Sequence, residues 1–367
     1  MIRIAAFGAL SYTLPTLLVS CGAPWPGLES LPPLRAWFCS AGTSETRVLP
    51  VRGVNLVAFR ADEFVGSGAK IDDALRTFGG LGGNWVAVNF WWFQDRADSA
   101  EIAPDEGLYT ISDEAIETAV RSAHTQGLNV LLRPMVDVRD ATWRGEIRPS
   151  PAWFASYQAF LERYSGLATT WNVEAFSVGV ELKASESHGP EWRALIAETR
   201  RSYDGQIVYC ANFDSAAELA WWDAVDVIGI DAYYAVAPWS GADVRLMTCA
   251  WRYWLDQMEQ TIGARFSDKP VWLTEVGARS ARGAARLPWC SADVCFHLVQ
   301  TQIVDVAEQA NYYRATLLAV SERTWIDGVF WWCWYADPSA AYVRETDYTP
   351  QNKPAEDVLA EFWTPRP

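Results

Sequence analysis

The sequence predicts a single-domain α/β protein built as a (β/α)8 TIM barrel, a closed ring of parallel strands. Three observations favour this fold. Eight short apolar segments recur along the 367-residue chain, helical patterns separate them, and polar residues stand near the C-terminal ends of several segments. Because each segment is apolar almost without interruption, both faces of the strand must be covered, as they are in parallel sheets flanked by helices.

The predicted strands are rich in β-branched and aromatic residues. In chain order they span residues 52–59, 84–93, 128–138, 174–182, 206–213, 225–234, 270–278 and 328–335. Helical patterns include residues 112–126, 151–164, 190–203, 246–262, 292–323 and 354–363. The first of these begins at Ser112, with Ala115 three residues on, which suits an N-cap. An open doubly wound sheet is the alternative, but Asn55-Leu56-Val57-Ala58 stands where such a sheet would carry a glycine-rich phosphate-binding turn.

Composition narrows the class of partner. Residues 50–367 suffice for one barrel of roughly 250 residues with insertions. The chain holds 21 tryptophans, 14 tyrosines and 15 phenylalanines, more aromatic surface than the core needs. Such rings stack on sugars, and core packing is the alternative use. The formal net charge of −15 disfavours nucleic acid and acidic lipid as partners. A neutral substrate such as a polysaccharide or oligosaccharide fits better.

The first 20 residues have the layout of a signal peptide. Arg3 precedes an apolar stretch over residues 4–18 that is too short for a membrane-spanning helix. Leu18-Val19-Ser20-Cys21 resembles a bacterial lipobox, in which the cysteine becomes the lipidated first residue of the mature protein. We therefore expect lipidation at Cys21 and a lipid anchor in the bacterial cell envelope, with Gly22 favouring the outer membrane. A simple cleaved signal with a coincidental cysteine is the alternative.

Residues 21–49 are rich in Pro, Gly and Ser, which predicts a tether or an N-terminal cap. If Cys21 is acylated, six cysteines remain, and in an exported protein they permit disulfides. They are Cys39, Cys210, Cys249, Cys290, Cys295 and Cys333. Cys290 and Cys295 are the first pair to expect, because they are close in sequence. No Cys-x-x-Cys pair or metal-like histidine spacing occurs, so no metal or other cofactor is expected.

Strand parity predicts which side chains enter the barrel, because alternate residues face its interior. Glu181, at the end of the fourth strand, shares a face with three small residues that suit the interior. These are Ala175, Ser177 and Gly179. On the seventh strand, Glu275 shares a face with Val271 and Leu273. Two carboxyl groups are therefore expected to converge at the C-terminal mouth.

Barrel enzymes keep their chemistry at that mouth. The polar and aromatic residues placed there by parity are Asn55, Asn89, Trp91, Arg133, Asp137, Glu181, Asn212, Asp231, Tyr233 and Glu275, followed by Trp331, Trp332 and Trp334. Two carboxyl groups among aromatic rings suit glycoside hydrolysis, in which one protonates the leaving oxygen and the other attacks or stabilises the anomeric carbon. A structural ion pair is the alternative for Glu275, and likewise for Arg133 with Asp137.

Five motifs, in order on the predicted strands, resemble the clan A glycoside hydrolases. They are Arg52-Gly53-Val54-Asn55, Ser177-Val178-Gly179-Val180-Glu181-Leu182, Asp231-Ala232-Tyr233-Tyr234, Thr274-Glu275-Val276-Gly277 and the tryptophan-rich eighth strand. Within the clan, the chain is most similar to family 113, the β-1,4-mannanases, and the tail with Tyr348-Thr349-Pro350 and Lys353-Pro354-Ala355 adds to the likeness. The resemblance covers residues 50–363.

The resemblance implies that Glu181 is the acid/base and Glu275 the nucleophile of a retaining double displacement on a β-1,4-linked polysaccharide, with mannan expected. Tyr233 would hydrogen-bond the nucleophile, and Arg133 would help to keep it ionised. Val180 stands where many clan members carry an asparagine that contacts the sugar 2-hydroxyl, which leaves the sugar open. The alternatives are another clan A activity such as a β-glucanase, and a non-catalytic glycan-binding lipoprotein with a barrel fold.

We expect a set of polar and aromatic residues to bind substrate. They are Asn55, Asn89, Trp91, Asp137, Trp143, Asn212, Trp332 and Trp334. Trp143 follows the third strand in a polar loop, so it is expected as an exposed platform for sugars. Trp221 and Trp222 are expected in the core. For Asn212, a role within its own loop is the alternative to binding sugar hydroxyls.

Overall fold

The structure is a computed structural model of the chain, and it describes residues 31–39, 47–290, 300–340 and 343–364. The predicted signal peptide, Cys21 and Cys295 lie outside the described residues. None of the helices in the described part combines the length and apolar character that a membrane crossing requires.

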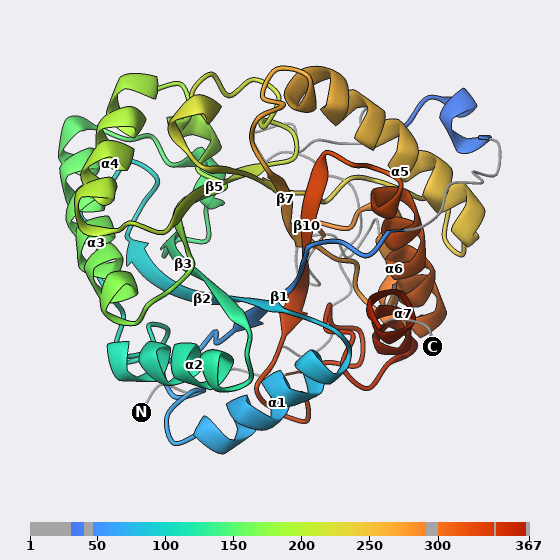
Figure 1. Ribbon diagram of the computed structural model, residues 1–367, viewed down its shortest axis with the longest axis horizontal. Coiled ribbons are helices and arrows are strands. Elements are labelled where there is room, and N and C mark those ends of the chain that lie inside the picture. The colour runs from blue at the N-terminus through green and yellow to red at the C-terminus, as the bar shows by residue number, and fades with distance from the viewer. Residues whose placement is uncertain (1–30, 40–46, 291–299, 341–342, 365–367) are drawn as a thin grey trace, which may run out of the picture. The chain divides into compact units, whose positions relative to one another are not determined.

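Eight parallel strands close into a barrel in the order β1-β10-β7-β6-β5-β4-β3-β2 (Figure 1). The strands are β1 (Val51–Val57), β2 (Trp85–Gln94), β3 (Asn129–Val138), β4 (Ala175–Val180), β5 (Gln206–Asn212), β6 (Val227–Asp231), β7 (Val271–Val276) and β10 (Ile326–Trp334). Each of the eight predicted strands overlaps one of them. The predicted (β/α)8 barrel is confirmed.

Within the described chain, seven α-helices surround the barrel (Figure 1). They are α1 (Gly68–Gly80), α2 (Asp113–Thr125), α3 (Pro151–Thr170), α4 (Gly189–Ser202), α5 (Val244–Met258), α6 (Val306–Ser321) and α7 (Pro354–Trp363). The Ser112 side chain accepts the N–H of Ala115, as its position predicts. Between β5 and β6 the chain makes the short 3-10 helix η5 (Trp222–Ala224) in place of an α-helix. Trp221 and Trp222 are buried there, which confirms their place in the core.

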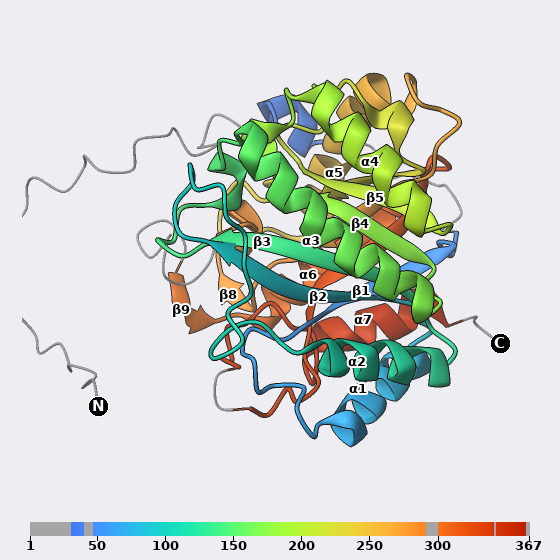
Figure 2. The same ribbon diagram turned by 90° about the vertical axis from the view of Figure 1, so that its left-hand side faces the viewer.

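The helix predicted over residues 292–323 is wrong over residues 300–305, and residues 292–299 lie outside the described part of the chain. The strand β9 (Gln300–Val304) pairs antiparallel with β8 (Ala281–Arg282) after the end of β7. Figure 2 shows this small sheet at the barrel end toward which β2 and β3 point. Its last residues, Ile303 and Val304, are β-branched and lose side-chain freedom in a helix. The helix α6 begins only after Asp305, whose carboxylate accepts the N–H of Glu308.

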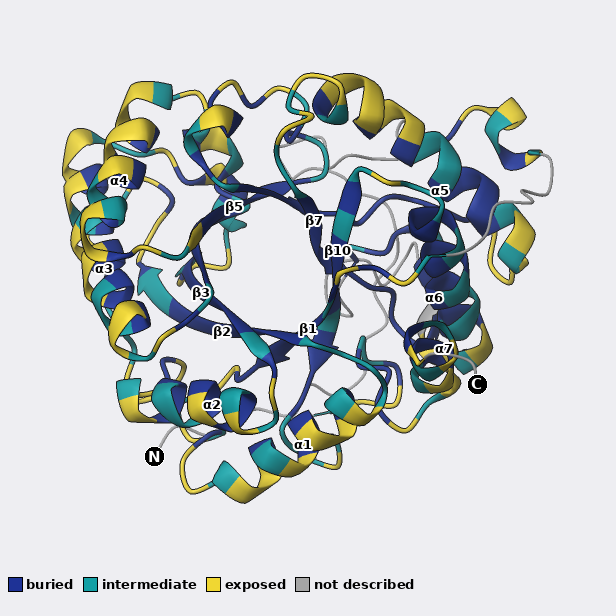
Figure 3. Ribbon diagram, viewed as in Figure 1, coloured by how far each residue is buried: buried dark blue, intermediate teal, exposed yellow. Residues whose placement is uncertain are grey.

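Side chains from all eight strands fill the barrel interior. Near its N-terminal end, the rings of Trp85 and Trp272 lie 5.0 Å apart, and those of Trp272 and Phe330 lie 5.7 Å apart. The strands are buried, whereas the outer faces of the helices are exposed (Figure 3). Polar groups at the C-terminal mouth therefore stand on an apolar floor.

Simple parity fails on β4 and β7. A Cβ added at Gly179 would lie 2.6 Å from the Tyr209 ring and 3.0 Å from Trp192 of α4, so Gly179 faces the helices. Val180 belongs to the interior cluster instead. A register shift against β5 between Ser177 and Gly179 causes this exchange.

On β7 the interior residue is Trp272, so its neighbour Leu273 faces outward and the expectation for Leu273 is wrong. The pairing of β6 with β7 shifts between Ile230 and Asp231. Glu275 reaches the mouth because of this irregularity, and not because strict alternation carries it there.

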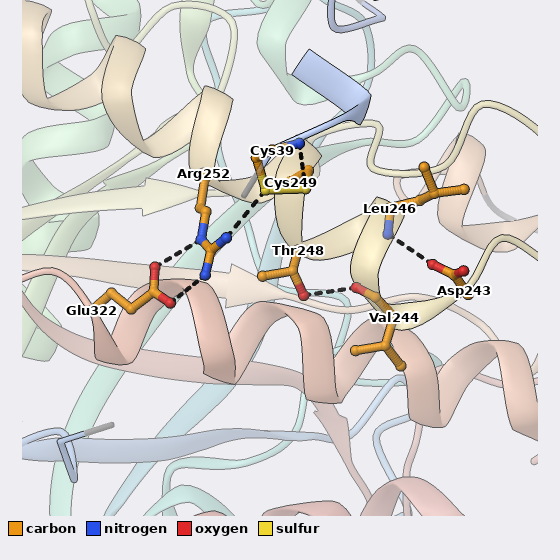
Figure 4. Close-up of a disulfide and its surroundings, with 8 residues drawn as sticks. All are labelled: Cys39, Asp243, Val244, Leu246, Thr248, Cys249, Arg252 and Glu322. Atoms are coloured by element: carbon orange, nitrogen blue, oxygen red, sulfur yellow. Dashed lines mark hydrogen bonds and ion pairs between the residues drawn. A yellow bond between two sulfur atoms is a disulfide. The ribbon is translucent and has the colours of Figure 1, made fainter. Parts of the chain in front are cut away.

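A disulfide fastens the N-terminal segment to α5. Cys39 and Cys249 are bonded, with their Cα atoms 5.4 Å apart and a sequence separation of 210 (Figure 4). Trp37, in the 3-10 helix η2 (Leu34–Trp37), is buried. The guanidinium of Arg252 donates to the Cys39 sulfur and pairs with Glu322. Part of the segment predicted as a tether is thus covalently joined to the barrel.

The remaining described cysteines differ in state. Cys290 is also disulfide-bonded, and Cys295, with which we expected it to pair, lies outside the described residues. Cys210 and Cys333 are free and buried.

Candidate active site

A buried polar network at the mouth of the barrel is centred on Arg133 of β3. Its Nη1 donates to the Oδ1 atoms of Asn55 at 2.5 Å and Asn89 at 3.1 Å. Its Nη2 lies 2.8 Å from Glu275 Oε1 and 3.3 Å from Asp231 Oδ2. The Arg133 side chain is fully buried. A buried charge is stable only when it is paired and hydrogen-bonded, and here carboxylates on β6 and β7 supply the pairing.

Asn55 and Asn89 serve this network and do not face the substrate. Both are fully buried. Asn55 also donates to the carbonyl of Thr274 at 3.0 Å, and Asn89 donates to the carbonyls of Leu56 and Ala87. The prediction that they bind substrate is wrong, because their amides are taken up in fixing Arg133.

Glu275 is held by two donors, one on each carboxylate oxygen. Arg133 Nη2 donates to Oε1 and the Tyr233 hydroxyl donates to Oε2, each at 2.8 Å. The hydrogen bond expected between Tyr233 and Glu275 is therefore present. The side chain of Glu275 is 5% exposed. Charge-assisted bonds of this kind are strong and hold a carboxylate in one orientation.

Asp231 sits beneath Glu275 in the same network. It is fully buried and accepts a hydrogen bond from the Thr274 hydroxyl at 2.8 Å. Burial and the negative charge of Glu275 raise its pKa well above the ordinary value for aspartate, while Arg133 opposes that shift. The network thus holds two carboxyl groups around one guanidinium.

Glu181 follows the last residue of β4 and turns into the mouth through its backbone. Its φ is 52°, in the left-handed region, and its N–H donates to the carbonyl of Cys210 at 2.8 Å. A non-glycine residue in this region is uncommon and costs about 1–2 kcal/mol. Together with the bulge at Gly179, this conformation brings the carboxyl group to the mouth. Such strain is typical of functional sites.

The environment of Glu181 differs from that of Glu275. Burial and the negative charge of Glu275 raise the pKa of Glu181 to about 7, against the opposing effects of Arg144 and Trp143. The Arg144 Nη1 lies 3.1 Å from Glu181 Oε2, and the Arg144 Nε lies 2.8 Å from Asp137 Oδ1. Glu181 is thus suited to carry a proton near neutral pH, whereas Glu275 is bound by a guanidinium and a hydroxyl, and two carboxyl groups in such different environments suit acid/base and nucleophilic roles.

Aromatic rings form one rim of the mouth. The Phe59 ring centroid lies 5.2 Å from that of Trp91, and 6.4 Å from those of both Trp332 and Tyr335. Phe59 is 38% exposed and offers its ring to solvent. A cavity of about 340 Å³ adjoins this rim, lined by residues that include Val57 and Asp337. The aromatic rim gives a flat surface for a sugar ring beside the carboxyl pair.

The structure divides the other expected substrate-binding residues. Trp332 is partly buried at the aromatic rim, and Trp91 is buried beneath it. Trp143 lies half-buried against Glu181, to which it is hydrogen-bonded. It is therefore part of the carboxyl environment and not an exposed platform. Asp137 holds Arg144.

The prediction for Trp334 is wrong. This residue is fully buried, and its indole N–H donates to the carbonyl of Ala74 in α1 at 3.2 Å. It faces the helices because successive strand residues point to opposite sides. Asn212 bonds within its own loop, donating to Asp214 and accepting the N–H of Phe213, which favours the loop role left open above.

Two residues that matter to the site were not singled out from the sequence. Phe59 ends a predicted strand, where an apolar residue reads as core. Arg144 follows Trp143 in a polar loop, where an arginine reads as a solvated charge. Its position seven residues after Asp137 was the only sign in the sequence that Arg144 pairs with that carboxylate. Among the described residues, no group of three or more His, Cys, Asp or Glu side chains could hold a metal ion.

Comparisons with known proteins agree with this geometry. No curated protein matches the chain. The family model of Glycoside Hydrolase Family 113 matches residues 61–353. A solved GH113 β-1,4-mannanase has a TM-score of 0.74 and 27% identity, covering 87% of this chain and 100% of that one. The GH113 β-mannanase AaManA from Alicyclobacillus acidocaldarius, in complex with ManMIm, has a TM-score of 0.72 and 29% identity, covering 86% and 97%.

A more distant structure shares the fold alone. It is the exo-β-1,4-mannosidase Op5Man5 from Opitutaceae bacterium strain TAV5, with a TM-score of 0.54 and 16% identity, covering 86% of this chain and 59% of that one. The family match spans most of the barrel and includes both mouth glutamates. This chain belongs to glycoside hydrolase family 113.

Proposed function

We propose that this glycoside hydrolase cleaves β-1,4-linked mannan with retention of configuration, using Glu275 as nucleophile and Glu181 as general acid/base. The observation that carries the proposal is the contrast between the two carboxyl groups. Glu275 accepts hydrogen bonds from the guanidinium of Arg133 and the hydroxyl of Tyr233, whereas the pKa of Glu181 is raised to about 7 by burial and by Glu275. Both glutamates act in each of the two steps of a double displacement.

In the first step, a Glu275 carboxylate oxygen forms a bond to the anomeric carbon as the glycosidic C–O bond breaks. Glu181 gives its proton to the departing oxygen, so the leaving sugar departs as an alcohol. In the second step, Glu181, now ionised, takes a proton from water as that water attacks the anomeric carbon. The bond to Glu275 breaks, and both glutamates return to their starting states. Two inversions give net retention.

Mannan is proposed as the substrate because the solved family members at 26–29% identity are β-mannanases. The aromatic rim around Phe59 suits a sugar chain that lies across the mouth. Val180 occupies the position before Glu181, so contacts to the sugar 2-hydroxyl must come from other residues.

The activity test measures reducing ends released from mannan and from a mixed-linkage β-glucan by wild type, Glu275→Ala and Glu181→Gln. We expect release from mannan by wild type and a loss of at least about a thousandfold in Glu275→Ala, since the nucleophile cannot be replaced. Equal release by wild type and Glu275→Ala would refute the catalytic assignment. Release from β-glucan alone would refute the sugar, and no release from either polysaccharide would favour a glycan-binding protein.

We further propose that the protein is exported and anchored by a lipid on Cys21. The Cys39–Cys249 disulfide supports export, because structural disulfides persist in oxidising compartments. Fractionation of cells that express wild type and Cys21→Ala tests the anchor. We expect wild type in the membrane fraction and the variant in the soluble fraction. An unchanged distribution would rule out the lipid on Cys21.

A further inference from the structure

We propose that Arg144 is a positioning residue for Glu181, and that Arg144 and Asp137 together orient the acid/base and balance its charge through the two steps of the reaction. The inference rests on the acid/base role proposed for Glu181 and adds a control of that role by the loop after β3. Neither residue needs to touch the substrate for this purpose.

The guanidinium of Arg144 links the two carboxylates in a fixed geometry. Its Nε contacts Asp137 Oδ1 at 2.8 Å and its Nη1 contacts Glu181 Oε2 at 3.1 Å. The Arg144 and Glu181 side chains are 14% and 13% exposed, so solvent screens their contact weakly. Because the guanidinium is a rigid plane, binding Nε to Asp137 on β3 determines where Nη1 points. Asp137 therefore aims Arg144 at Glu181.

The loop that carries Arg144 is itself fastened. Trp143 accepts the N–H of Glu146 at 2.9 Å, and Arg144 accepts the N–H of Ile147 at 3.1 Å. The next residue, Arg148, donates its N–H to the carbonyl of Ala97, in the loop after β2, at 2.9 Å. The first two bonds close the 3-10 helix η3 (Arg144–Glu146), and the bond from Arg148 fastens its C-terminal side to the loop after β2.

Trp143 contacts the same carboxyl group. A hydrogen bond from Trp143 lowers the pKa of Glu181, although burial and Glu275 dominate and raise it. The indole folds back over Gly145, where an added Cβ would lie 2.4 Å from the ring. Two consecutive loop residues therefore hold one carboxyl group.

The charged groups around Glu181 come from four places on the mouth. Glu275 on β7 and Asp231 on β6 contribute carboxyl groups, β3 contributes Arg133 and Asp137, and the loop after β3 contributes Arg144, which pairs with Asp137. Burial and Glu275 favour the protonated form of Glu181, whereas Arg144 favours the ionised form. A general acid that must become a base in the next step works best when neither its protonated nor its ionised form is strongly favoured. The positive charge of Arg144 stabilises the ionised form of Glu181 and so lets Glu181 release its proton.

This balance predicts opposite effects for the two members of the pair. In Arg144→Gln the cation is lost and the pKa of Glu181 rises. In Asp137→Asn the cation remains but its neutralising carboxylate is lost, so the pKa of Glu181 falls. In a retaining enzyme the basic limb of kcat/KM against pH reports the acid/base, because activity is lost as that group deprotonates. A residue with a merely structural role would lower kcat without moving this limb in two directions.

The experiment measures kcat/KM against pH on a manno-oligosaccharide for wild type, Arg144→Gln, Arg144→Lys and Asp137→Asn. We expect the basic limb to move up by about one pH unit in Arg144→Gln and down in Asp137→Asn, the size expected for a nearby opposite charge. Arg144→Lys should restore most of the wild-type position, because it keeps the charge. Arg139→Gln is the matched control. Arg139 is a cation in the same loop, but it pairs with Asp105 and Asp95. The basic limb of kcat/KM should therefore stay at the wild-type pH in Arg139→Gln.

Two outcomes would overturn the proposal. In one, the basic limbs of Arg144→Gln and Asp137→Asn coincide with that of wild type. In the other, both limbs move in the same direction. If Arg144→Gln fails to fold, the downward shift in Asp137→Asn and the restored limb in Arg144→Lys still decide it. Glu181→Gln separates the two claims. Full activity of that variant on the oligosaccharide would refute the proposed function itself, whereas an inactive Glu181→Gln with unmoved limbs in the loop variants would refute only the role of Arg144.

Discussion

The hydroxyl of Tyr233 makes the one hydrogen bond to Glu275 Oε2 that the described contacts include. Removing it in Tyr233→Phe frees one oxygen of Glu275, the proposed nucleophile, while the ring remains. A hydrogen bond to a charged group contributes about 1.5–3 kcal/mol, so kcat should fall by roughly ten- to a hundredfold. Tyr234→Phe is the matched control, because its hydroxyl donates to the carbonyl of Phe213. A loss in Tyr234→Phe as large as that in Tyr233→Phe would contradict a specific role for the Glu275 contact.

Arg133 stabilises the fold as well as the site. In Arg133→Met, Asp231 and Glu275 would remain buried without their cation, which costs about 3–5 kcal/mol in the free energy of unfolding. Without the opposing effect of Arg133, the pKa of Asp231, already raised by burial and by Glu275, would lie further above its value in the unfolded protein. The protonated form of Asp231 is the stable one in the fold, so the variant should lose less stability at low pH and more as pH rises.

Urea unfolding of wild type and Arg133→Met at pH 5 and pH 7.5 checks this dependence. The difference between the two proteins should be larger at pH 7.5. A difference that is the same at both pH values would mean that loss of packing, and not unpaired charge, causes the destabilisation.

For single residues, the sequence predicted which side chains stand at the strand ends better than it predicted what those side chains contact. Glu181, Glu275, Tyr233 and Arg133 meet as expected, because strand ends on one edge of a barrel must converge. Asn55, Asn89 and Trp334 stand at those ends too, yet they face Arg133 or α1. Which side chains a buried arginine engages depends on partners that lie far away in sequence.

The loop after β3 is the element on which Glu181, the proposed acid/base, depends. In Gly145→Ala, the new methyl group would overlap the Trp143 ring, which must move away from Glu181. We expect a loss of about 1–3 kcal/mol in stability from the overlap, and a fall in kcat. Gly166→Ala is the control, because nothing lies within 4 Å of a Cβ at this helical position. Alanine should stabilise α3 there by about 0.5–1 kcal/mol.

Thermal unfolding and kcat on mannan, measured for both variants, check this prediction. If Gly145→Ala keeps wild-type kcat while its stability falls, the placement of Trp143 does not matter to catalysis.

All eight strands and most helices were predicted from local pattern, but the helix α1 was not singled out and the details of β4 and β7 were not predicted. Bulges arise from the register of one strand against its neighbour, so Gly179 and Leu273 cannot be assigned a face from their own segments. The error over residues 300–305 has a related cause. An apolar run there fits a helix by period, whereas pairing of Gln300–Val304 with β8 decides its structure.

For the molecule as a whole, the Cys39–Cys249 disulfide ties the N-terminal segment to the barrel. Its removal in the double variant Cys39→Ser, Cys249→Ser should cost about 2–5 kcal/mol of stability, because the unfolded chain gains freedom over a long loop. Neither cysteine contacts Glu181 or Glu275 in the described structure, so kcat at 25 °C should not change.

Denaturant unfolding and mannan hydrolysis, measured side by side, check this separation. A stable double variant would mean that the contacts of Trp37 alone hold the segment. The pair could not be predicted from the sequence, because 210 residues separate its members and only the closed barrel brings α5 beside the N-terminal segment.

Covalent trapping tests the central claim most directly. The enzyme is incubated with a 2-deoxy-2-fluoro-β-mannosyl fluoride, which slows release of the glycosyl group more than its transfer to the nucleophile, and its peptides are then analysed by mass spectrometry. We predict one fluoroglycosyl group per chain, on the peptide that contains Glu275, and none in Glu275→Ala. A label on another carboxyl group, or no label in a preparation that hydrolyses mannan, would contradict a double displacement through Glu275.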